Sequence, residues 1–203
     1  MTSHYLTQIM LTPKVIKQQK ITDTYSLHRL VYDQFERDLF KEGEDRSMPI
    51  WAISNASETQ KVFILSKALP RVVHEVVGKN RRTIMMPEEF LKQKEYSFKV
   101  TLNPVRRQKD KVFPIKESEQ IAIWFCELAK RNGFSVNKDK LCISNVYADI
   151  FKKSNMTVTL NKADISGVLV VENDKLFTDA VLNGIGRSKA FGCGLLQVIP
   201  SNH

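Results

Sequence analysis

The sequence predicts an α+β protein in which antiparallel sheets carry helices on one face. Segments that alternate between apolar and polar residues are interspersed with apolar residues at helical spacing. The same order of elements, close to β-α-β-β-α-β, occurs twice, without internal sequence similarity. A length of 203 residues suits two modest domains or one large one. The repeated order favours two domains.

The first copy occupies residues 1–108, which we expect to form the N-terminal domain. Asp23 or Thr24 can cap an amphipathic helix whose apolar residues recur at steps of three and four up to Phe40. Strands are predicted over residues 5–11, 50–54, 61–65 and 96–102. Residues 68–94 allow either a helix or a strand, with a helical turn after Pro87.

The second copy follows a break at Asn103-Pro104 and a basic stretch, so residues 109–203 are expected to form the C-terminal domain. One helix begins near Ser118 and ends at Gly133, and a shorter one spans Lys175 to Leu182. Strands or extended segments are predicted over residues 112–115, 141–150, 156–160, 167–171 and 195–199. Together the two copies predict two tandem ferredoxin-like (RRM-like) domains, each an antiparallel sheet with helices on one face.

Composition and charge restrict the class of protein. The chain is 42% hydrophobic and 26% charged, which excludes disordered, collagen-like and low-complexity proteins. It has no apolar run long enough to span a membrane and no recognisable secretory signal. Its 3 cysteines are an odd number and none are at C-x-x-C spacing, which favours a reducing compartment. We therefore expect a cytoplasmic protein. A net charge of +9 favours nucleic acid as the partner, although a basic surface can also serve solubility alone.

The densest motif is a glycine-rich segment near the C-terminal end, residues 184–196. It contains Gly184, Gly186, Gly192 and Gly194, with Arg187 and Lys189 between them. Lys189 stands where a dinucleotide-binding fingerprint needs glycine, and no Gly-Lys-[Ser/Thr] sequence makes it a P-loop. The chemistry alone leaves two interpretations, a cradle of N–H groups for a phosphate and a tight connection from helix to strand.

This segment closely resembles the glycine-rich signature of the CasE-type CRISPR-associated endoribonucleases. Tyr25-Ser-Leu-His28-Arg resembles the start of the family's first helix. Asn103-Pro104 and the stretch Phe113-Pro-Ile-Lys116 to Ala122 resemble its mid-chain segment and the opening of its second domain. The resemblance implies two ferredoxin-like domains, cleavage of precursor CRISPR RNA within its repeats, and assembly into a multi-subunit surveillance complex.

Candidate catalytic residues follow from what metal-free RNA cleavage requires: a base, an acid, and groups that neutralise the phosphorane. Histidine suits proton transfer near neutral pH, and the chain has His4, His28, His74 and His203. By position alone His28 is a histidine on a helix surface. The resemblance implies instead that His28 is the general acid or base and Tyr25 its partner, with the division of roles left open. Tyrosine, with a reference pKa of about 10, is a poor base unless shifted, and Tyr25 can also be a packing aromatic.

Basic residues are the candidates for contact with RNA. The predicted contacts are Arg106, Arg107, Lys109, Lys111, Lys116, Lys152, Lys153, Arg187 and Lys189, the last two beside the scissile phosphate. Asp and Glu are scattered, and no metal-binding motif is present, so we expect neither a metal nor a cofactor.

The predicted function is therefore a metal-independent endoribonuclease that cleaves a CRISPR repeat hairpin. Attack by a 2′-hydroxyl leaves a 2′,3′-cyclic phosphate and a 5′-hydroxyl, and the enzyme stays bound to its product. The expected partners are the repeat RNA and other subunits of a surveillance complex. The alternatives are a non-cleaving RNA-hairpin-binding module and a phosphate-binding metabolic enzyme.

Overall fold

The computed structural model describes residues 3–36, 48–54, 59–71 and 74–201. The chain divides into two compact units. The first contains Met1–Met86 together with Ala190–Gly192, and the second contains Pro87–Lys189 together with Cys193–His203. The boundary expected at 108/109 therefore falls inside the second unit, and the chain returns briefly to the first unit near its end.

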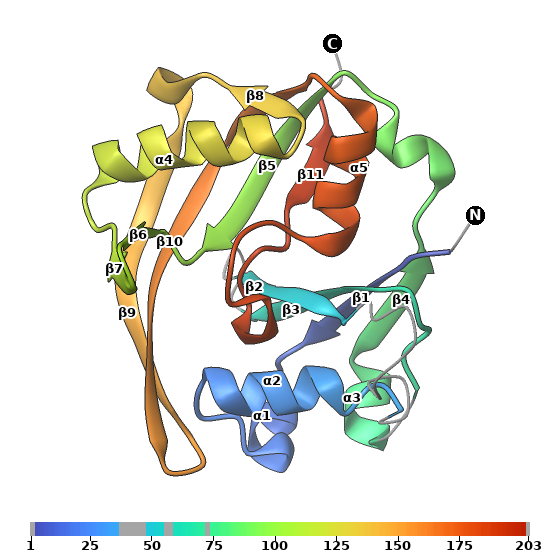
Figure 1. Cartoon of the computed structure of the whole chain (residues 1–203). Helices are drawn as coiled ribbons and strands as arrows, with labels where there is room; N and C mark the ends of the chain where they lie inside the picture. The colour runs from blue at the N-terminus through green and yellow to red at the C-terminus, as the bar shows by residue number, and fades with distance from the viewer. Residues whose placement is uncertain (1–2, 37–47, 55–58, 72–73, 202–203) are drawn as a thin grey trace. The chain divides into compact units, whose positions relative to one another are not determined.

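The first unit is one four-stranded antiparallel sheet with helices on one face (Figure 1). Its elements are β1 (Tyr5–Met10), α1 (Pro13–Gln19), α2 (Thr24–Tyr32), β2 (Ile50–Ser54), β3 (Lys61–Ser66), α3 (Glu75–Lys79) and β4 (Arg81–Met85). The strand order β2-β3-β1-β4 places β1 and β3 at the centre and pairs every neighbour antiparallel. With α1–α2 and α3 as the two helical connections, this is the ferredoxin-like topology.

The core of the first unit lies between this sheet and its helices. Its buried residues are Ile9, Leu11, Val15, Leu27, Leu30, Val31, Phe35, Trp51, Val62, Ile64 and Val77. Helix α2 begins with a reciprocal capping box, because the Asp23 carboxylate accepts from Ser26 N at 2.8 Å and the Ser26 hydroxyl accepts from Asp23 N at 3.0 Å. Burial of the apolar side of α2 leaves its aromatic and histidine side chains at the rim of the core.

The second unit repeats the topology with two additions. Its strands and helices are β5 (Glu95–Leu102), β6 (Val105–Gln108), β7 (Lys111–Pro114), α4 (Ser118–Arg131), β8 (Phe134–Val136), β9 (Cys142–Lys153), β10 (Met156–Val171), α5 (Asp174–Asn183) and β11 (Gln197–Pro200). Short 3₁₀ turns occur at η2 (Glu88–Leu91) and η3 (Lys138–Lys140), and a third, η4 (Lys189–Phe191), lies where the chain returns to the first unit. The antiparallel order β11-β5-β10-β8, with α4 and α5 on one face, is again ferredoxin-like (Figure 1).

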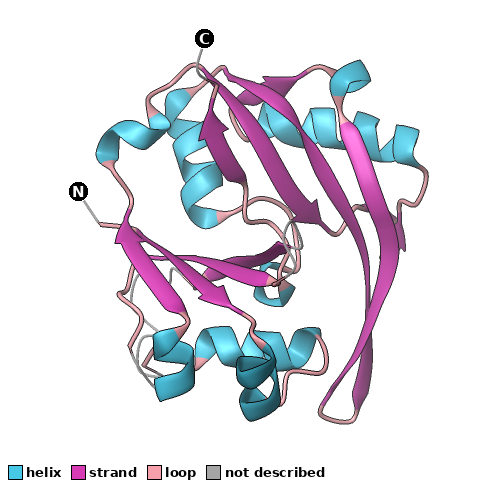
Figure 2. Ribbon diagram, turned by 180° about the vertical axis from the view of Figure 1, so that it is seen from behind, coloured by secondary structure: helices cyan, strands magenta, loops and turns pink. Residues whose placement is uncertain are grey.

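The additions are two hairpins. Strand β9 pairs with β10 along most of its length, and the two form the long twisted ribbon visible in Figure 2. Strands β6 and β7 pair only with each other and form a separate two-stranded sheet. The fold class is thus confirmed, and both hairpins extend it.

Several predicted elements differ from the observed ones. Helix α1 and strands β6 and β8 were not predicted, and β10 is one strand where two were expected, over residues 156–160 and 167–171. Helix α2 ends at Tyr32, and the remainder of the predicted helix beyond residue 36 lies outside the described residues. The fourth strand of the first unit is β4, from the ambiguous segment 68–94, so the strand predicted over 96–102 opens the second unit as β5. This reassignment moves the boundary between units.

Across the described ranges, no helix is long and apolar enough to cross a membrane.

Candidate active site

His28 lies on α2, half-buried, and its ring has a defined hydrogen-bond partner. Its Nδ1 is 2.9 Å from the backbone carbonyl oxygen of Ala190, which belongs to the first unit. A carbonyl oxygen only accepts hydrogen bonds, so Nδ1 carries a proton in this arrangement. In the neutral ring Nε2 then bears the lone pair, and in the imidazolium Nε2 bears a second, transferable proton.

Three aromatic rings surround His28. The ring centroids of Tyr32, Phe191 and Tyr25 lie 4.1, 5.4 and 5.8 Å from that of His28, and Tyr25 is stacked. Burial raises the pKa of Tyr32, so its phenol stays protonated at neutral pH. Tyr25 is half-buried one helical turn before His28, with the Arg29 guanidinium carbon 5.9 Å from its ring centroid. Tyr25 and His28 thus lie in ring contact on one flank of α2.

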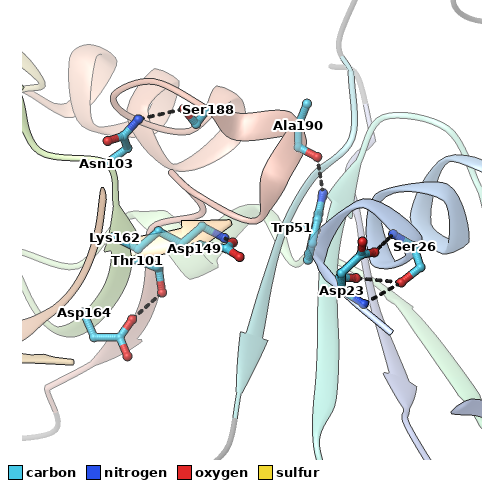
Figure 3. A network of polar contacts seen from close by, with 10 residues as sticks. All are labelled: Asp23, Ser26, Trp51, Thr101, Asn103, Asp149, Lys162, Asp164, Ser188 and Ala190. Atoms are coloured by element: carbon cyan, nitrogen blue, oxygen red, sulfur yellow. Dashed lines mark hydrogen bonds and ion pairs between the residues drawn. The ribbon is translucent and has the colours of Figure 1, made fainter. Parts of the chain in front are cut away.

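The Ala190 carbonyl accepts a second hydrogen bond, from the indole N–H of Trp51 on β2, at 3.0 Å (Figure 3). Trp51 is fully buried. Gly192, two residues further along, has φ +76°, and a Cβ at that position would lie 2.9 Å from the Trp51 ring atom Cζ3. Both the backbone conformation and the packing at residue 192 thus require glycine.

The parts of the glycine-rich segment that belong to the second unit form a tight connection from α5 to β11. Ile185 N donates to Gly194 O at 2.9 Å, and Gly194 N donates to the Thr101 carbonyl on β5 at 2.8 Å. The amide of Asn103 donates to the Ser188 hydroxyl at 3.0 Å (Figure 3). The N–H groups of Ile185 and Gly194 are thus used within the protein, which at these positions favours the structural interpretation over a phosphate cradle.

The two cations of this segment differ in their surroundings. The Lys189 ammonium donates to the Asn183 carbonyl at 2.8 Å, and burial lowers its pKa. Arg187 is exposed. Lys189 therefore helps to hold the connection after α5, whereas Arg187 is available to a ligand.

Four predicted RNA-binding residues lie on the β6–β7 hairpin. Arg106, Arg107, Lys109 and Lys111 are all exposed. Arg106 pairs with Phe113, and Gln108 pairs with Lys111. Since paired residues share a face and successive residues alternate, Arg106 and Lys111 lie on one face and Arg107 on the other. The hairpin thus presents a two-cation face and a one-cation face.

The remaining predicted cations are also exposed. Lys152 and Lys153 lie at the end of β9, and Lys116 precedes α4. In the body of the β9–β10 ribbon, by contrast, the buried Lys162 ammonium lies 2.8 Å from the Asp149 carboxylate. Asp164 accepts from the Thr101 hydroxyl at 2.6 Å and from the Asn145 amide at 3.0 Å. Paired side chains therefore fill the middle of β10 and exposed cations lie at the tip of the ribbon.

The other histidines lie elsewhere. His74 immediately precedes α3, where it lines a cavity of about 500 Å³ with Lys14, Lys20 and Arg29 among its other residues. His203 lies outside the described residues. In the described part of the chain, no three His, Cys, Asp or Glu side chains are grouped as ligands for a metal ion.

Sequence reasoning missed three neighbours of His28, namely Tyr32, Ala190 and Phe191, and also Trp51, which shares the Ala190 carbonyl with it. Tyr32 lies four residues after His28, and this helical spacing could have indicated contact. No local signal identifies the others, because Ala190 is 162 residues from His28 and 139 from Trp51.

The comparisons with known proteins match nearly the whole chain. The CRISPR endoribonuclease Cse3 bound to a 19-nucleotide RNA has a TM-score of 0.80 and 20% identity, over 98% of this chain and 100% of that one. Cas6e from Escherichia coli K-12 has a TM-score of 0.67 and 23% identity, over 97% and 100%. A chain of a CRISPR RNA-guided surveillance complex has a TM-score of 0.67 and 17% identity, over 97% and 100%.

At these identities the solved structures establish the fold. A search of curated proteins gave no match. A family model described as "CRISPR associated protein" matches residues 4–200, almost the entire sequence. This chain therefore belongs to the CRISPR-associated protein family.

Proposed function

We propose that this protein is a CasE-type endoribonuclease that cleaves precursor CRISPR RNA in its repeat hairpin. The carrying observation is the hydrogen bond from His28 Nδ1 to the Ala190 carbonyl, which places the lone pair of the neutral ring on Nε2. Family membership and the fold shared with an endoribonuclease bound to RNA support the assignment.

The proposed reaction uses the RNA's own 2′-hydroxyl. The hydroxyl loses its proton, and its oxygen attacks the adjacent phosphorus in line with the departing 5′-oxygen. The P–O5′ bond breaks, the leaving oxygen takes up a proton, and a 2′,3′-cyclic phosphate remains on the upstream fragment. Histidine and tyrosine exchange or orient these protons, and a cation stabilises the phosphorane, so the step needs no metal ion.

His28 Nε2 is the proposed proton-transfer atom, and Tyr25 positions the 2′-hydroxyl or the scissile phosphate. A base must be neutral to act, so a rate that rises with pH through the histidine pKa identifies Nε2 as the base. A rate that falls through the same range identifies Nε2–H as the acid. The phenol hydroxyls of Tyr25 and Tyr32 offer hydrogen-bond donors beside it.

The exposed cations of the second unit are proposed to bind the phosphates of the hairpin stem. Duplex RNA exposes phosphates and 2′-hydroxyls more readily than base edges in its narrow major groove. A two-stranded hairpin carrying four exposed cations and a ribbon tip carrying two are suited to that surface. Most such contacts persist after one bond is broken, so product release is slow and turnover stays near one per enzyme.

A retained product fits assembly with other subunits. One solved structure that shares the fold is part of an RNA-guided surveillance complex. We propose that this chain carries its processed RNA into a similar complex.

The test uses a labelled repeat hairpin under single-turnover conditions in excess EDTA. Cleavage should proceed, and the products should end in a 2′,3′-cyclic phosphate and a 5′-hydroxyl. A matched RNA with one 2′-deoxynucleotide immediately upstream of the cut should bind with unchanged affinity and remain intact. A magnesium requirement, or cleavage of the deoxy RNA, would refute the 2′-hydroxyl mechanism. Binding without cleavage of either RNA would favour the hairpin-binding module.

A further inference from the structure

We propose that Trp51 and the Ala190–Gly192 segment together hold His28 in position, and that Trp51 is a positioning residue for RNA cleavage. This inference rests on the proposed function, since it assigns a role to the groups that hold the proton-transfer histidine. It gives the glycine-rich segment a task other than phosphate binding.

The Ala190 carbonyl is the centre of this arrangement. Its oxygen accepts from His28 Nδ1 at 2.9 Å and from Trp51 Nε1 at 3.0 Å. A carbonyl oxygen has two lone pairs, and two N–H donors use both of them. The carbonyl therefore has no lone pair left for water, and its direction is fixed by two donors from separate elements, α2 and β2.

Trp51 makes this arrangement rigid. The indole is fully buried and is a donor only, so its N–H needs an acceptor, and the Ala190 carbonyl provides one. The ring also occupies the space in which a Cβ of residue 192 would lie. Contact between glycine and indole thus holds the peptide that faces His28, while Phe191 packs beside the histidine ring.

The functional consequence is selection of one tautomer. Free neutral histidine exchanges its proton between the two ring nitrogens, and only the form protonated at Nδ1 leaves a lone pair on Nε2. A fixed carbonyl opposite Nδ1 selects that form and also fixes the ring plane. Loss of the Trp51 donor should therefore reduce the correctly oriented population without removing any group that touches RNA.

The first test compares Trp51→Phe with Trp124→Phe, a control at the chain's other tryptophan, on α4. Trp51→Phe keeps an aromatic ring and removes the N–H. We expect the single-turnover rate to fall about tenfold, the scale of one hydrogen bond, with unchanged affinity for the 2′-deoxy RNA. Trp124→Phe should leave the rate unchanged. Nitrogen-15 NMR of the histidine ring should show Nδ1 protonated in the parent and mixed tautomers in Trp51→Phe.

A variant that leaves all side chains unchanged separates this role from core packing. Phenyllactic acid in place of Phe191, introduced by nonsense suppression, turns the Ala190 carbonyl into an ester carbonyl, which is a weaker acceptor. It should lower the rate and mix the tautomers as Trp51→Phe does, even if Trp51→Phe proves too unstable to measure.

A double-mutant cycle gives the deciding measurement. In a His28→Ala background the Trp51 donor has no histidine to position, so Trp51→Phe should leave the residual rate unchanged. An equal fractional loss in both backgrounds would overturn the inference, as would an unaltered tautomer in the ester variant. Wild-type cleavage by His28→Ala alone would instead overturn the proposed function, so the two failures are distinguishable.

Discussion

The β6–β7 hairpin predicts that RNA affinity depends on one face of a two-stranded sheet. Arg106 and Lys111 share a face with the half-exposed Phe113, whereas Arg107 points to the other face. One face of a hairpin can lie against an RNA stem at a time. We expect the Arg106 face to bind, because it carries two cations and an aromatic ring.

The magnitude follows from counterion release. Each lost phosphate contact reduces the slope of log K against log salt by about 0.7–0.9. Arg106→Ala combined with Lys111→Ala should therefore reduce the slope by about 1.4–1.8. Between about 50 and 200 mM salt, a fourfold range, this means that the parent loses about 7- to 12-fold more affinity than the double variant. Arg107→Ala should leave the slope unchanged.

The assay is equilibrium binding of a 2′-deoxy repeat hairpin over that salt range, so that cleavage does not distort the titration. Lys130→Ala, which removes an exposed cation from the last turn of α4, is the control for a general loss of charge. Equal slope changes for Arg106→Ala and Arg107→Ala would show that the face assignment is wrong. Unchanged slopes for all variants would show that the hairpin does not contact phosphates.

Three further outcomes are expected. His28→Ala should lower the single-turnover cleavage rate by about 10²–10⁴ and leave affinity for the 2′-deoxy RNA unchanged, and a parental rate would remove His28 from the mechanism. Gly194→Ala should destabilise the protein by about 1–3 kcal/mol in chemical denaturation, because φ is +87° and a Cβ would lie 2.5 Å from a backbone carbonyl oxygen. Gly167→Ala, whose nearest contact is 3.3 Å at ordinary φ, is the control and should cost less. Burial raises the pKa of Cys193 to about 11, so at pH 8 only about one thiol in a thousand is ionised to the reactive thiolate. Ellman's reagent should therefore modify the exposed Cys142 before Cys193, and equal rates of modification would contradict the burial of Cys193.

The order of elements was predictable because it depends on local periodicity. The apolar spacing in α2 and α4 and the alternation in β5 indicate their types directly. Helix α1 also has a local signal in the sequence, because Thr12 caps it through Val15 N and Pro13 occupies its first position.

The missed features depend on partners that are distant in sequence. Polar residues in the middle of β10 interrupt the strand pattern, yet Lys162 pairs with Asp149 and Asp164 with Thr101 on neighbouring strands. These pairs offset the free-energy cost of desolvating the polar groups in the strand. The partners are distant in sequence, so no short stretch of sequence identifies them. Strand β8 is too short, over Phe134–Val136, for periodicity to identify.

In the candidate site, too, local features were predictable and contacts between distant residues were not. His28 and Tyr25 were predicted from a resemblance to a family. Because they are three residues apart on one helix, their closeness in space follows from the local sequence alone. The sequence allowed two interpretations of the glycine-rich segment, a cradle of N–H groups for a phosphate and a tight connection from helix to strand. The structure adds a contact with the histidine itself, through a peptide 162 residues away.

The return of Ala190–Gly192 to the first unit affects when, during synthesis, the histidine acquires its partner. A ribosome makes the sheet and helices of that unit first, and these can fold while the second unit is still being translated. Until residue 190 emerges, the nascent first unit has His28 and Trp51 but no carbonyl between them. A proteolytic fragment that ends before the glycine-rich segment would be in the same condition. Under the proposed mechanism, competence for cleavage is thus acquired only after residue 190 has emerged, so an incomplete chain can be partly folded and still lack the contact that positions His28.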